Sequence, residues 1–446
     1  MKAKSRRLEL ETPGRRTVTG FFRTTYGKEL WPLVVALLVA LPAVVRADFN
    51  YTTNNGTITI TEYTGPGGAV VIPDSINGLP VTSIGDSAFA FQSLTSVTIP
   101  NSVTNIGEEA FQGCTDLTGV NIPNGVTTIG EDAFSDCYSL TAMTIPASVT
   151  SIGSDAFAAC SSLSAITVDA LNPAFSSVDG VLFNKSQTLL IQCPGGRAGS
   201  YTIPNSVTSI GEDAFSGCTN LTSITIPNSV TNIGEDAFQD CESLTSLMIP
   251  SSVTSIGEDA FSSCLNLSAI TVSALNPAYS SVDGVLFSKN QTLLIQYPAG
   301  RAGSYTVPAS VASIGNNAFQ DCFSLTAIYF QGDAPSISED AFESAENVIA
   351  YYLPGTTGWG MTFAGRPAVL LNALMVLTSS LGVLENGFEF TFTGASNLVV
   401  VVEAATNLVS PVWVPVGTNT LTGGTSYFSD PGWTNHPARF YRLRSP

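Results

Sequence analysis

The sequence predicts a repeat solenoid with one β-strand and one short helical turn in each unit of about 23 residues, followed by a small all-β domain at the C-terminus. The hexapeptide Ile-Gly-acid-acid-Ala-Phe occupies residues 106–111 and returns at residues 129–134. A fixed period of this length is typical of stacked supersecondary units that bury their apolar faces against each other. The phenylalanine of the unit recurs along most of the chain, at Phe89, Phe111, Phe134, Phe157, Phe215, Phe238, Phe261, Phe319 and Phe342.

The first 47 residues are predicted to be an export leader. They hold nine of the 17 basic residues of the chain, and they contain an apolar run at residues 31–45. This run is shorter than the roughly 20 residues that span a membrane, and residues 45–47 place small or aliphatic side chains where a signal peptidase reads them. We expect cleavage after Ala47, with Ala43 as the alternative. The mature chain is then secreted or held at the cell surface without spanning the membrane.

The chain that follows residue 47 is strongly acidic. It carries 8 basic residues against 32 acidic ones, a formal net charge of −24. Such a charge disfavours nucleic acids and anionic lipids as partners. The whole composition, 44% hydrophobic and 12% charged, fits units that each send several apolar side chains into one continuous core.

Each unit has an extended half and a turn half. In the extended half, Leu117, Val120 and Ile122 place apolar side chains on one face, and Pro123 ends the strand because it lacks a backbone donor. The turn half, Glu-Asp-Ala-Phe-x-x-Cys, spaces its apolar residues as a helix does and begins with acids. We therefore expect one helical turn with carboxylates at its positive end. An Asn-Ser-Val-Thr-x-Ile-Gly segment joins the halves and supplies a turn and a second short strand.

Two insertions interrupt the period. The phenylalanine series steps by 58 residues instead of 23 after Phe157 and after Phe261, so each insertion adds 35 residues, at about 169–203 and 273–307. The inserted segments match each other, because Asn-Pro-Ala-Phe-Ser-Ser-Val-Asp-Gly-Val-Leu-Phe at 172–183 returns 104 residues later with Tyr as its fourth residue. Asp-Gly between alternating apolar runs indicates a β-hairpin. Each insertion is predicted to form a small hairpin before rejoining the stack.

These motifs carry a family resemblance. The unit Ile-Gly-x-x-Ala-Phe-x-x-Cys-x-x-Leu-x-x-Ile-x-Ile-Pro, with its interspersed Asn-Pro-x-Tyr-Ser-Ser-Val-Asp-Gly blocks, resembles the BspA-like leucine-rich repeat family from about residue 50 to residue 368. The resemblance implies a solenoid of the leucine-rich-repeat type in an exported or surface protein, and several such bacterial proteins act in adhesion to host matrix proteins or to other cells. It brings no shared catalytic residue.

The ends of the chain differ from the repeats. Residues 48–82 alternate apolar and polar residues and are predicted to form an N-terminal β cap on the solenoid, which spans residues 83–368. Residues 372–446 alternate again and are predicted to form a small β-sandwich-like domain. Its closing segment, residues 438–444, resembles tails that serve as sorting or surface-attachment modules.

The cysteines form a ladder that favours structural packing over chemistry. Seven of the eight stand three residues after the repeat phenylalanine, and stacked units would set one sulfur about every 5 Å along a line, without the convergence that a metal needs. Buried cysteine packs as a small hydrophobe, and the odd number of rungs argues against disulfides. Cys193 stands apart, and its counterpart one superrepeat later is Tyr297. The ladder consists of Cys114, Cys137, Cys160, Cys218, Cys241, Cys264 and Cys322.

The repeated acidic pairs are the strongest candidate for a functional site in this sequence. Stabilisation of helix ends nevertheless explains them better than a functional site does. Stacked carboxylates about 5 Å apart match the spacing of a retaining glycosidase, but catalysis needs an apolar pocket around one carboxyl, and repeated acids on an edge are solvated. Weak structural Ca²⁺ binding is the runner-up. The pairs are Glu108–Glu109, Glu131–Asp132, Glu212–Asp213, Glu235–Asp236 and Glu258–Asp259.

The sequence predicts no catalytic, cofactor-binding or metal residues. His436 is the single histidine and has no nucleophile near it in the sequence. We expect a non-enzymatic protein that recognises an extracellular protein or polysaccharide through an extended surface, with the C-terminal domain as a surface-attachment module. The alternatives are a passive structural or envelope spacer, stabilised by Ca²⁺, and after it a polysaccharide-acting enzyme.

Overall fold

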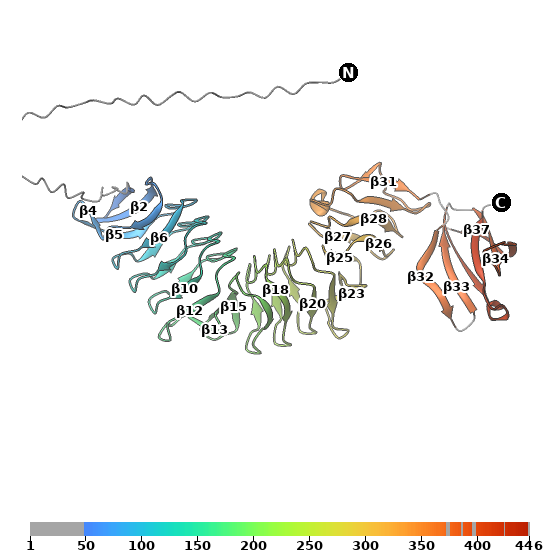
Figure 1. Ribbon diagram of the computed structural model, residues 1–446, viewed down its shortest axis with the longest axis horizontal. Helices are drawn as coiled ribbons and strands as arrows, with labels where there is room; N and C mark the ends of the chain where they lie inside the picture. The colour runs from blue at the N-terminus through green and yellow to red at the C-terminus, as the bar shows by residue number, and fades with distance from the viewer. Residues whose placement is uncertain (1–48, 372–374, 385–386, 395–397, 423, 445–446) are drawn as a thin grey trace, which may run out of the picture. The chain divides into compact units, whose positions relative to one another are not determined.

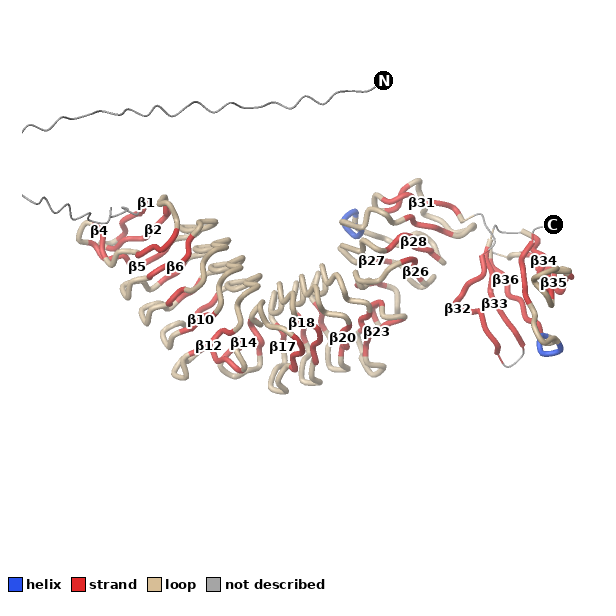
Figure 2. Tube along the Cα trace, viewed as in Figure 1, coloured by secondary structure: helices blue, strands red, loops and turns tan. Residues whose placement is uncertain are grey.

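The structure is a computed structural model that describes residues 49–371, 375–384, 387–394, 398–422 and 424–444. The predicted export leader, residues 1–47, lies outside the described residues. Residues 49–371 form a solenoid of stacked coils, and the C-terminal residues form separate antiparallel sheets (Figure 1, Figure 2). The predicted fold class, a repeat solenoid followed by small β-sheets, is confirmed.

One side of the solenoid, here called the Ile-Gly face, consists of short parallel strands. Ile106 pairs with Ile129, and Ile129 pairs with Ile152, so each strand lies one coil from the next. The following glycine is required by the close approach of the coils, because a Cβ on Gly130 would lie 2.5 Å from the backbone nitrogen of Glu108. The strands of this face are β2 (Thr57–Tyr63), β5 (Leu79–Ile84), β7 (Asn105–Ile106), β9 (Thr128–Ile129), β11 (Ser151–Ile152), β17 (Ser209–Ile210), β19 (Asn232–Ile233), β21 (Ser255–Ile256) and β27 (Ser313–Ile314).

A second side, here called the Leu-Thr face, carries the predicted extended half of each unit. Its strands also pair in parallel, with Met143 beside Ile166 and Leu247 beside Ile270, except that β30 (Thr362–Phe363) pairs antiparallel with β31 (Arg366–Leu370). The strands are β3 (Gly68–Val71), β6 (Leu94–Thr98), β8 (Val120–Asn121), β10 (Ala142–Ile145), β12 (Ala165–Val168), β16 (Gly199–Thr202), β18 (Leu221–Thr225), β20 (Ser246–Ile249), β22 (Ala269–Val272), β26 (Gly303–Val307), β28 (Leu325–Phe330), β29 (Ile349–Tyr352), β30 (Thr362–Phe363) and β31 (Arg366–Leu370).

The third side, here called the turn ladder, differs from the expected helical turn. Its segments are consecutive turns, and in the described solenoid a 3-10 helix forms only at η1 (Glu339–Phe342). Glu109 and Gly113 have left-handed backbones, with φ of 52° and 66°. This conformation turns alternate N–H groups along the solenoid axis, and Glu109 N–H donates to the carbonyl of Glu131 in the next coil at 2.8 Å. The chain thus exchanges hydrogen bonds within a helix for bonds between coils.

The core is a column of aromatic rings flanked by thiols. The ring of Phe111 stacks on Phe89 with centroids 4.9 Å apart and on Phe134 with centroids 5.2 Å apart. The same stacking recurs after each insertion, as in the 5.0 Å contact of Phe215 with Phe238. All eight cysteines have exposed fractions of 0% and are free thiols. The prediction that the cysteine ladder packs inward is confirmed.

Each insertion forms the predicted hairpin, and side chains of the hairpin pack into the hydrophobic core. Strand β13 pairs antiparallel with β14, and the intervening Asp179 and Gly180 have φ of 50° and 81°, as a tight hairpin turn requires. Leu182 packs into the core before the insertion, whereas Phe183 packs into the core after it. The strands are β13 (Phe175–Val178), β14 (Val181–Asn184), β15 (Leu189–Gln192), β23 (Tyr279–Val282), β24 (Val285–Ser288) and β25 (Leu293–Gln296).

A buried asparagine fastens each insertion to the coil before it. The Asn172 amide donates to the carbonyl oxygens of Pro146 and Val149 at 2.8 and 2.9 Å. Its own oxygen accepts from the N–H groups of Ala174 and Phe175. Asn276 repeats these four bonds in the second insertion. Because every polar atom of the amide is satisfied, the side chain can lie fully buried.

Both ends of the described chain are antiparallel. At the N-terminal end β1 (Phe49–Asn54) pairs with β2, and β4 (Ser75–Ile76) pairs with β5. The C-terminal sheets, β32-β33-β36 and β35-β34-β37, enclose a small core that includes Phe390, Phe392 and Val402. Their elements are β32 (Met375–Leu384), β33 (Gly387–Thr393), β34 (Val399–Ala405), β35 (Val414–Thr420), β36 (Thr425–Asp430), η2 (Trp433–Asn435) and β37 (Phe440–Arg444).

Candidate functional site

The acidic pairs lie on the turn ladder, where the second acid of each pair adopts the backbone conformation that the turn requires. The first acid of each pair is exposed, and the second is half-buried with a left-handed backbone, as at Asp213 and Asp236 with φ of 49° and 48°. Asp and Asn adopt this conformation more readily than most residues. The expected stabilisation of a helix end is therefore wrong for these coils, because no helix forms there.

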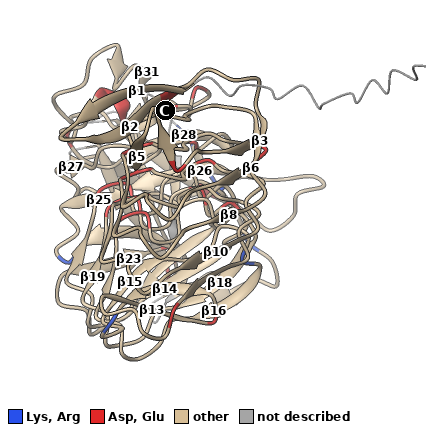
Figure 3. Ribbon diagram, turned by 90° about the vertical axis from the view of Figure 1, so that its left-hand side faces the viewer, with Lys and Arg blue, Asp and Glu red and all other residues tan. Residues whose placement is uncertain are grey.

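Acidic positions outnumber basic ones along the ribbon (Figure 3), and the ion pairs found among the described residues lie in the C-terminal sheets, away from the acids of the turn ladder. The basic residues of the first insertion bind backbone carbonyl groups of the insertion and not the acids of the ladder. Arg197 donates to the Asp179 carbonyl at 2.7 Å, and Lys185 donates to the Asn172 carbonyl at 2.5 Å. Burial, followed by repulsion from Asp259 and neighbouring acids, raises the pKa of Asp236 to about 6. Within the described residues no group of three or more His, Cys, Asp or Glu side chains is placed to hold a metal ion.

At the first insertion the turn ladder closes tightly over the inserted strands. Asp155 and Asp213, from the coils before and after it, bring their carboxyl groups together. Burial, followed by hydrogen bonding with Asp155 and repulsion from it, raises the pKa of Asp213, so Asp213 retains its proton above the usual carboxyl range. Four residues further along the same contact, a Cβ on Gly217 would lie 2.8 Å from the Cα of Ala159. The backbones of the two coils therefore lie close together at this point.

At the second insertion hydrogen-bonded side chains bridge the same two positions. Asn317 Nδ2 donates to Asp259 Oδ2 at 2.8 Å, and Ser263 Oγ donates to Asp321 Oδ2 at 2.8 Å. These bridges hold the coils together while leaving space beside them.

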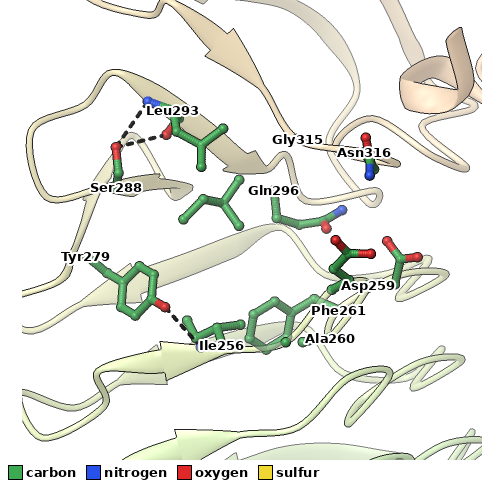
Figure 4. Close-up of a pocket in the computed structure, with 13 residues that line it drawn as sticks. Ile256, Asp259, Ala260, Phe261, Tyr279, Ser288, Leu293, Gln296, Gly315 and Asn316 are labelled. Carbon is green, nitrogen blue, oxygen red and sulfur yellow. Dashed lines mark hydrogen bonds between the residues drawn. The ribbon is translucent and has the colours of Figure 1, made fainter. Parts of the chain in front are cut away.

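A cleft of about 300 Å³ opens in that space (Figure 4). The inter-coil hydrogen bonds of the ladder are interrupted at both insertions, because among the described residues the backbone N–H groups of Asp259 and Phe261, like those of Asp155 and Phe157, have no carbonyl partner in a following coil. The Tyr279 hydroxyl, which replaces a phenylalanine of the first insertion, accepts from Ile256 N–H at 2.9 Å. The polar residues of the lining are Glu258, Asp259, Tyr279, Ser288, Gln296 and Asn316.

The geometry of the repeats agrees with a sequence comparison. The family profile described as BspA type Leucine rich repeat region matches residues 82–194, 197–300 and 301–358 in six copies. The chain belongs to the BspA-type leucine-rich repeat family. No curated protein matches the sequence.

Several solved structures resemble this BspA-type chain. A leucine-rich cell surface protein of Faecalibacterium prausnitzii is 30% identical, and the match covers 69% of this chain and 88% of that protein with a TM-score of 0.40. A leucine-rich repeat protein of T. pallidum is 32% identical over 49% of this chain and 87% of its own, with a TM-score of 0.32. One from Bacteroides ovatus is 23% identical over 69% and 93%, with a TM-score of 0.37.

Outside the BspA-type repeats, the C-terminal sheets hold a second cavity of about 470 Å³. Its wall includes Trp413, whose ring lies 4.6 Å from the guanidinium carbon of Arg442. Arg442 also binds Glu403 at 2.7 Å, and this hydrogen bond is the main cause that lowers the pKa of Glu403. His436 ends η2 and lies outside this lining. No helix in the described part of the chain is long and apolar enough to cross a membrane.

The role of the differences between the two insertions was not predicted. Asn317 replaces an aspartate, Asp321 replaces a glycine, and Tyr279 replaces a phenylalanine at matching positions. These substitutions were visible in the sequence. Their meaning depends on contacts between residues 58 positions apart, which the hairpin makes adjacent.

Proposed function

We propose that this BspA-type protein is exported and recognises an extracellular protein or polysaccharide through its solenoid, with the cleft at the second insertion as a principal contact. The leader-like N-terminal sequence supports export. The 30% identical F. prausnitzii relative is described as a cell surface protein, which agrees with a surface location. A repeat solenoid offers an extended surface rather than a deep catalytic pocket.

The open cleft beside the interrupted turn ladder carries the proposal. In regular coils the backbone donors are consumed by the next coil, as in the 2.8 Å bond from Phe111 to Ala133. At the cleft two such donors are free, and a carboxylate, an amide and a half-buried tyrosine lie beside them. A mixture of donors and acceptors beside an aromatic ring suits a hydroxyl-rich ligand such as a glycan, or a polar loop of a protein.

The same geometry supports binding rather than catalysis. Glycoside hydrolysis needs two carboxyl groups on opposite sides of the scissile bond. In the cleft, Asp259 is engaged by Asn317, and its neighbour Glu258 is exposed to solvent. We therefore propose that the protein is not an enzyme.

The test is a binding screen of the exported protein against extracellular-matrix proteins and polysaccharides, with and without Ca²⁺. Tyr279→Phe and Glu258→Ser install the residues of the first insertion at the cleft, and Glu235→Ser removes the same charge from a regular coil as a control. We expect the unsubstituted protein to bind its ligand saturably. Each of the two cleft variants should lower the affinity about tenfold, equivalent to about 1.4 kcal/mol. The control variant should keep the affinity of the unsubstituted protein.

Two results would count against the proposal. Equal affinities for all variants would move the contact away from the cleft. An absence of saturable binding by the unsubstituted protein would favour the passive spacer, and a Ca²⁺-dependent rise in melting temperature would then support Ca²⁺ stabilisation.

We further propose that the C-terminal sheets attach the protein to the cell surface. The supporting observation is the apolar cavity beside Trp413, with exposed Leu408 and Val412 nearby in sequence. Cells producing Trp413→Ala should release more protein into the medium than cells producing the unsubstituted chain. An unchanged distribution between cells and medium would contradict attachment through this cavity.

A further inference from the structure

The thiols of the regular coils share one hydrogen-bonding pattern. Each donates to the carbonyl oxygen of the phenylalanine that belongs to the coil before its own, at 3.1 Å for Cys114 and 3.3 Å for Cys137. Cys160, Cys241 and Cys264 make the same bond at 3.1, 3.3 and 3.1 Å. These sulfurs are fixed against the backbone, although they lie one above another.

Cys218 departs from this pattern because it follows the first insertion. Its coil is preceded by the end of the inserted segment, where Cys193 N–H donates to the carbonyl of Ala214 at 2.6 Å. The nearest acceptors of the Cys218 thiol are the carbonyl oxygens of Cys193 and Pro194, at 3.8 and 3.6 Å. Both distances are longer than the bonds in the regular coils.

Cys193 occupies the space beside Cys218. Its sulfur lies 4.0 Å from the same Pro194 oxygen that the Cys218 sulfur approaches at 3.6 Å, so the two thiols gather around one carbonyl group. Both side chains have an exposed fraction of 0%. Cys193, the one cysteine outside the ladder of seven, therefore lies where it can pair with Cys218.

The second insertion shows what fills this position without a cysteine. Tyr297 replaces Cys193, and its ring packs 5.3 Å from that of Phe319. Cys322, the counterpart of Cys218, directs its thiol to the carbonyl of Gln320 at 3.5 Å. The cysteine pair is thus particular to the first insertion.

We propose that Cys193 and Cys218 form a disulfide when the protein folds outside the reducing cytoplasm. The bond would close a loop of 25 residues and fasten the exit of the first insertion to the coil that follows. Cross-links of this kind restrict the unfolded chain and stabilise the fold. Disulfides persist in extracytoplasmic compartments, so formation in the cell rests on the proposed export.

The chemistry is thiol-disulfide exchange with a small-molecule or protein disulfide as the oxidant. One cysteine thiolate attacks a sulfur of the oxidant and releases its first thiol. The second cysteine thiolate then displaces the remaining thiol and completes the S–S bond. Two protons and two electrons leave the pair, and the oxidant departs as two thiols. Hydrogen bonding with Cys193, together with burial, raises the pKa of the Cys218 thiol. The folded protein therefore holds little of the reactive thiolate, and we expect the exchange to take place during folding or when the coil opens locally.

The experiment refolds the full chain from denaturant with oxidised and reduced glutathione. Free thiols are counted in denaturant, and cross-linked peptides are mapped by mass spectrometry. We expect two of the eight thiols to be lost, a peptide joined through Cys193 and Cys218, and a melting temperature that falls when dithiothreitol is added.

Three variants sharpen the result. Cys193→Ser and Cys193→Tyr, the second copying Tyr297, should keep every remaining thiol free and melt at the same temperature with or without dithiothreitol. Cys241→Ser should still lose two thiols. Eight free thiols in the folded unsubstituted protein, or a cross-link between other cysteines, would overturn the proposal. Because glutathione is supplied in the experiment, this outcome is independent of where the protein resides.

Discussion

Asn317 and Asp259, 58 residues apart in sequence, are joined by a 2.8 Å hydrogen bond from an amide to a carboxylate. At the matching place one superrepeat earlier, Asp213 meets Asp155, and two carboxyl groups share the contact. The amide can donate at any pH, whereas the carboxyl pair needs a proton. The two insertions therefore respond differently to pH.

Replacing Asp213 with asparagine should stabilise the protein at alkaline pH. Asp213 and Asp236 have raised pKa values in the fold, so the native state binds protons more tightly than the unfolded chain. The stability they contribute is complete below the ordinary carboxyl pKa of about 4 and is lost as the pH rises through the folded values, about 6 for Asp236. Melting temperatures should fall over this range, and Asp213→Asn should reduce the fall.

The matched control for this prediction is Asn317→Asp, which places a carboxyl pair at the second insertion. It should steepen the pH dependence of the melting temperature. Identical pH profiles for both variants and the unsubstituted protein would show that these contacts do not titrate with folding.

Asn172→Ala should lower the free energy of unfolding by about 2–4 kcal/mol, because it leaves buried backbone donors and acceptors without partners. Four hydrogen bonds are lost with the amide. Asn205→Ala removes an exposed amide from the next coil and should change stability by less than about 0.5 kcal/mol. Denaturant unfolding measures both, and similar effects would refute the anchoring role of Asn172.

Gly130→Ala should destabilise the solenoid by at least about 1–3 kcal/mol, the usual effect of forcing atoms into a packed interior. The added Cβ would lie 2.5 Å from backbone atoms of Gly107 and Glu108, which cannot move aside as a side chain does. Gly119→Ala meets no atom within 4 Å and should be neutral or slightly stabilising. Thermal melting compares the two, and equal melting temperatures would contradict the close approach of the coils.

Phe134→Ala should lower the free energy of unfolding by about 3–5 kcal/mol because it opens a cavity in the aromatic column. The ring lies between Phe111 and Phe157, with centroids 5.2 and 5.9 Å away. Tyr138→Ala, which truncates a 47% exposed ring, is the control and should have a much smaller effect. A comparable loss from both, measured by denaturant unfolding, would argue against a continuous core.

The sequence was sufficient for the features that repeat. The period of the phenylalanines predicted the stacked coils, and Asp179 with Gly180 predicted a hairpin that the structure confirms. These inferences succeed because periodic apolar residues and turn residues act locally, within a single unit. The conformation of the acidic turns was not predicted correctly. Helical spacing of Ala, Phe and Cys cannot show that an acid beside them will adopt a left-handed backbone and bond to the next coil.

Contacts across the insertions were decided by the tertiary structure. By itself the sequence determined a BspA-type solenoid with two inserted hairpins, since each unit specifies its own turns and its own buried side. Only the folded chain brings Asn317 to Asp259 and Cys193 to Cys218, because the path of the hairpin sets which coils become neighbours. The cleft arises for the same reason, where an inserted strand separates two coils that would otherwise have paired.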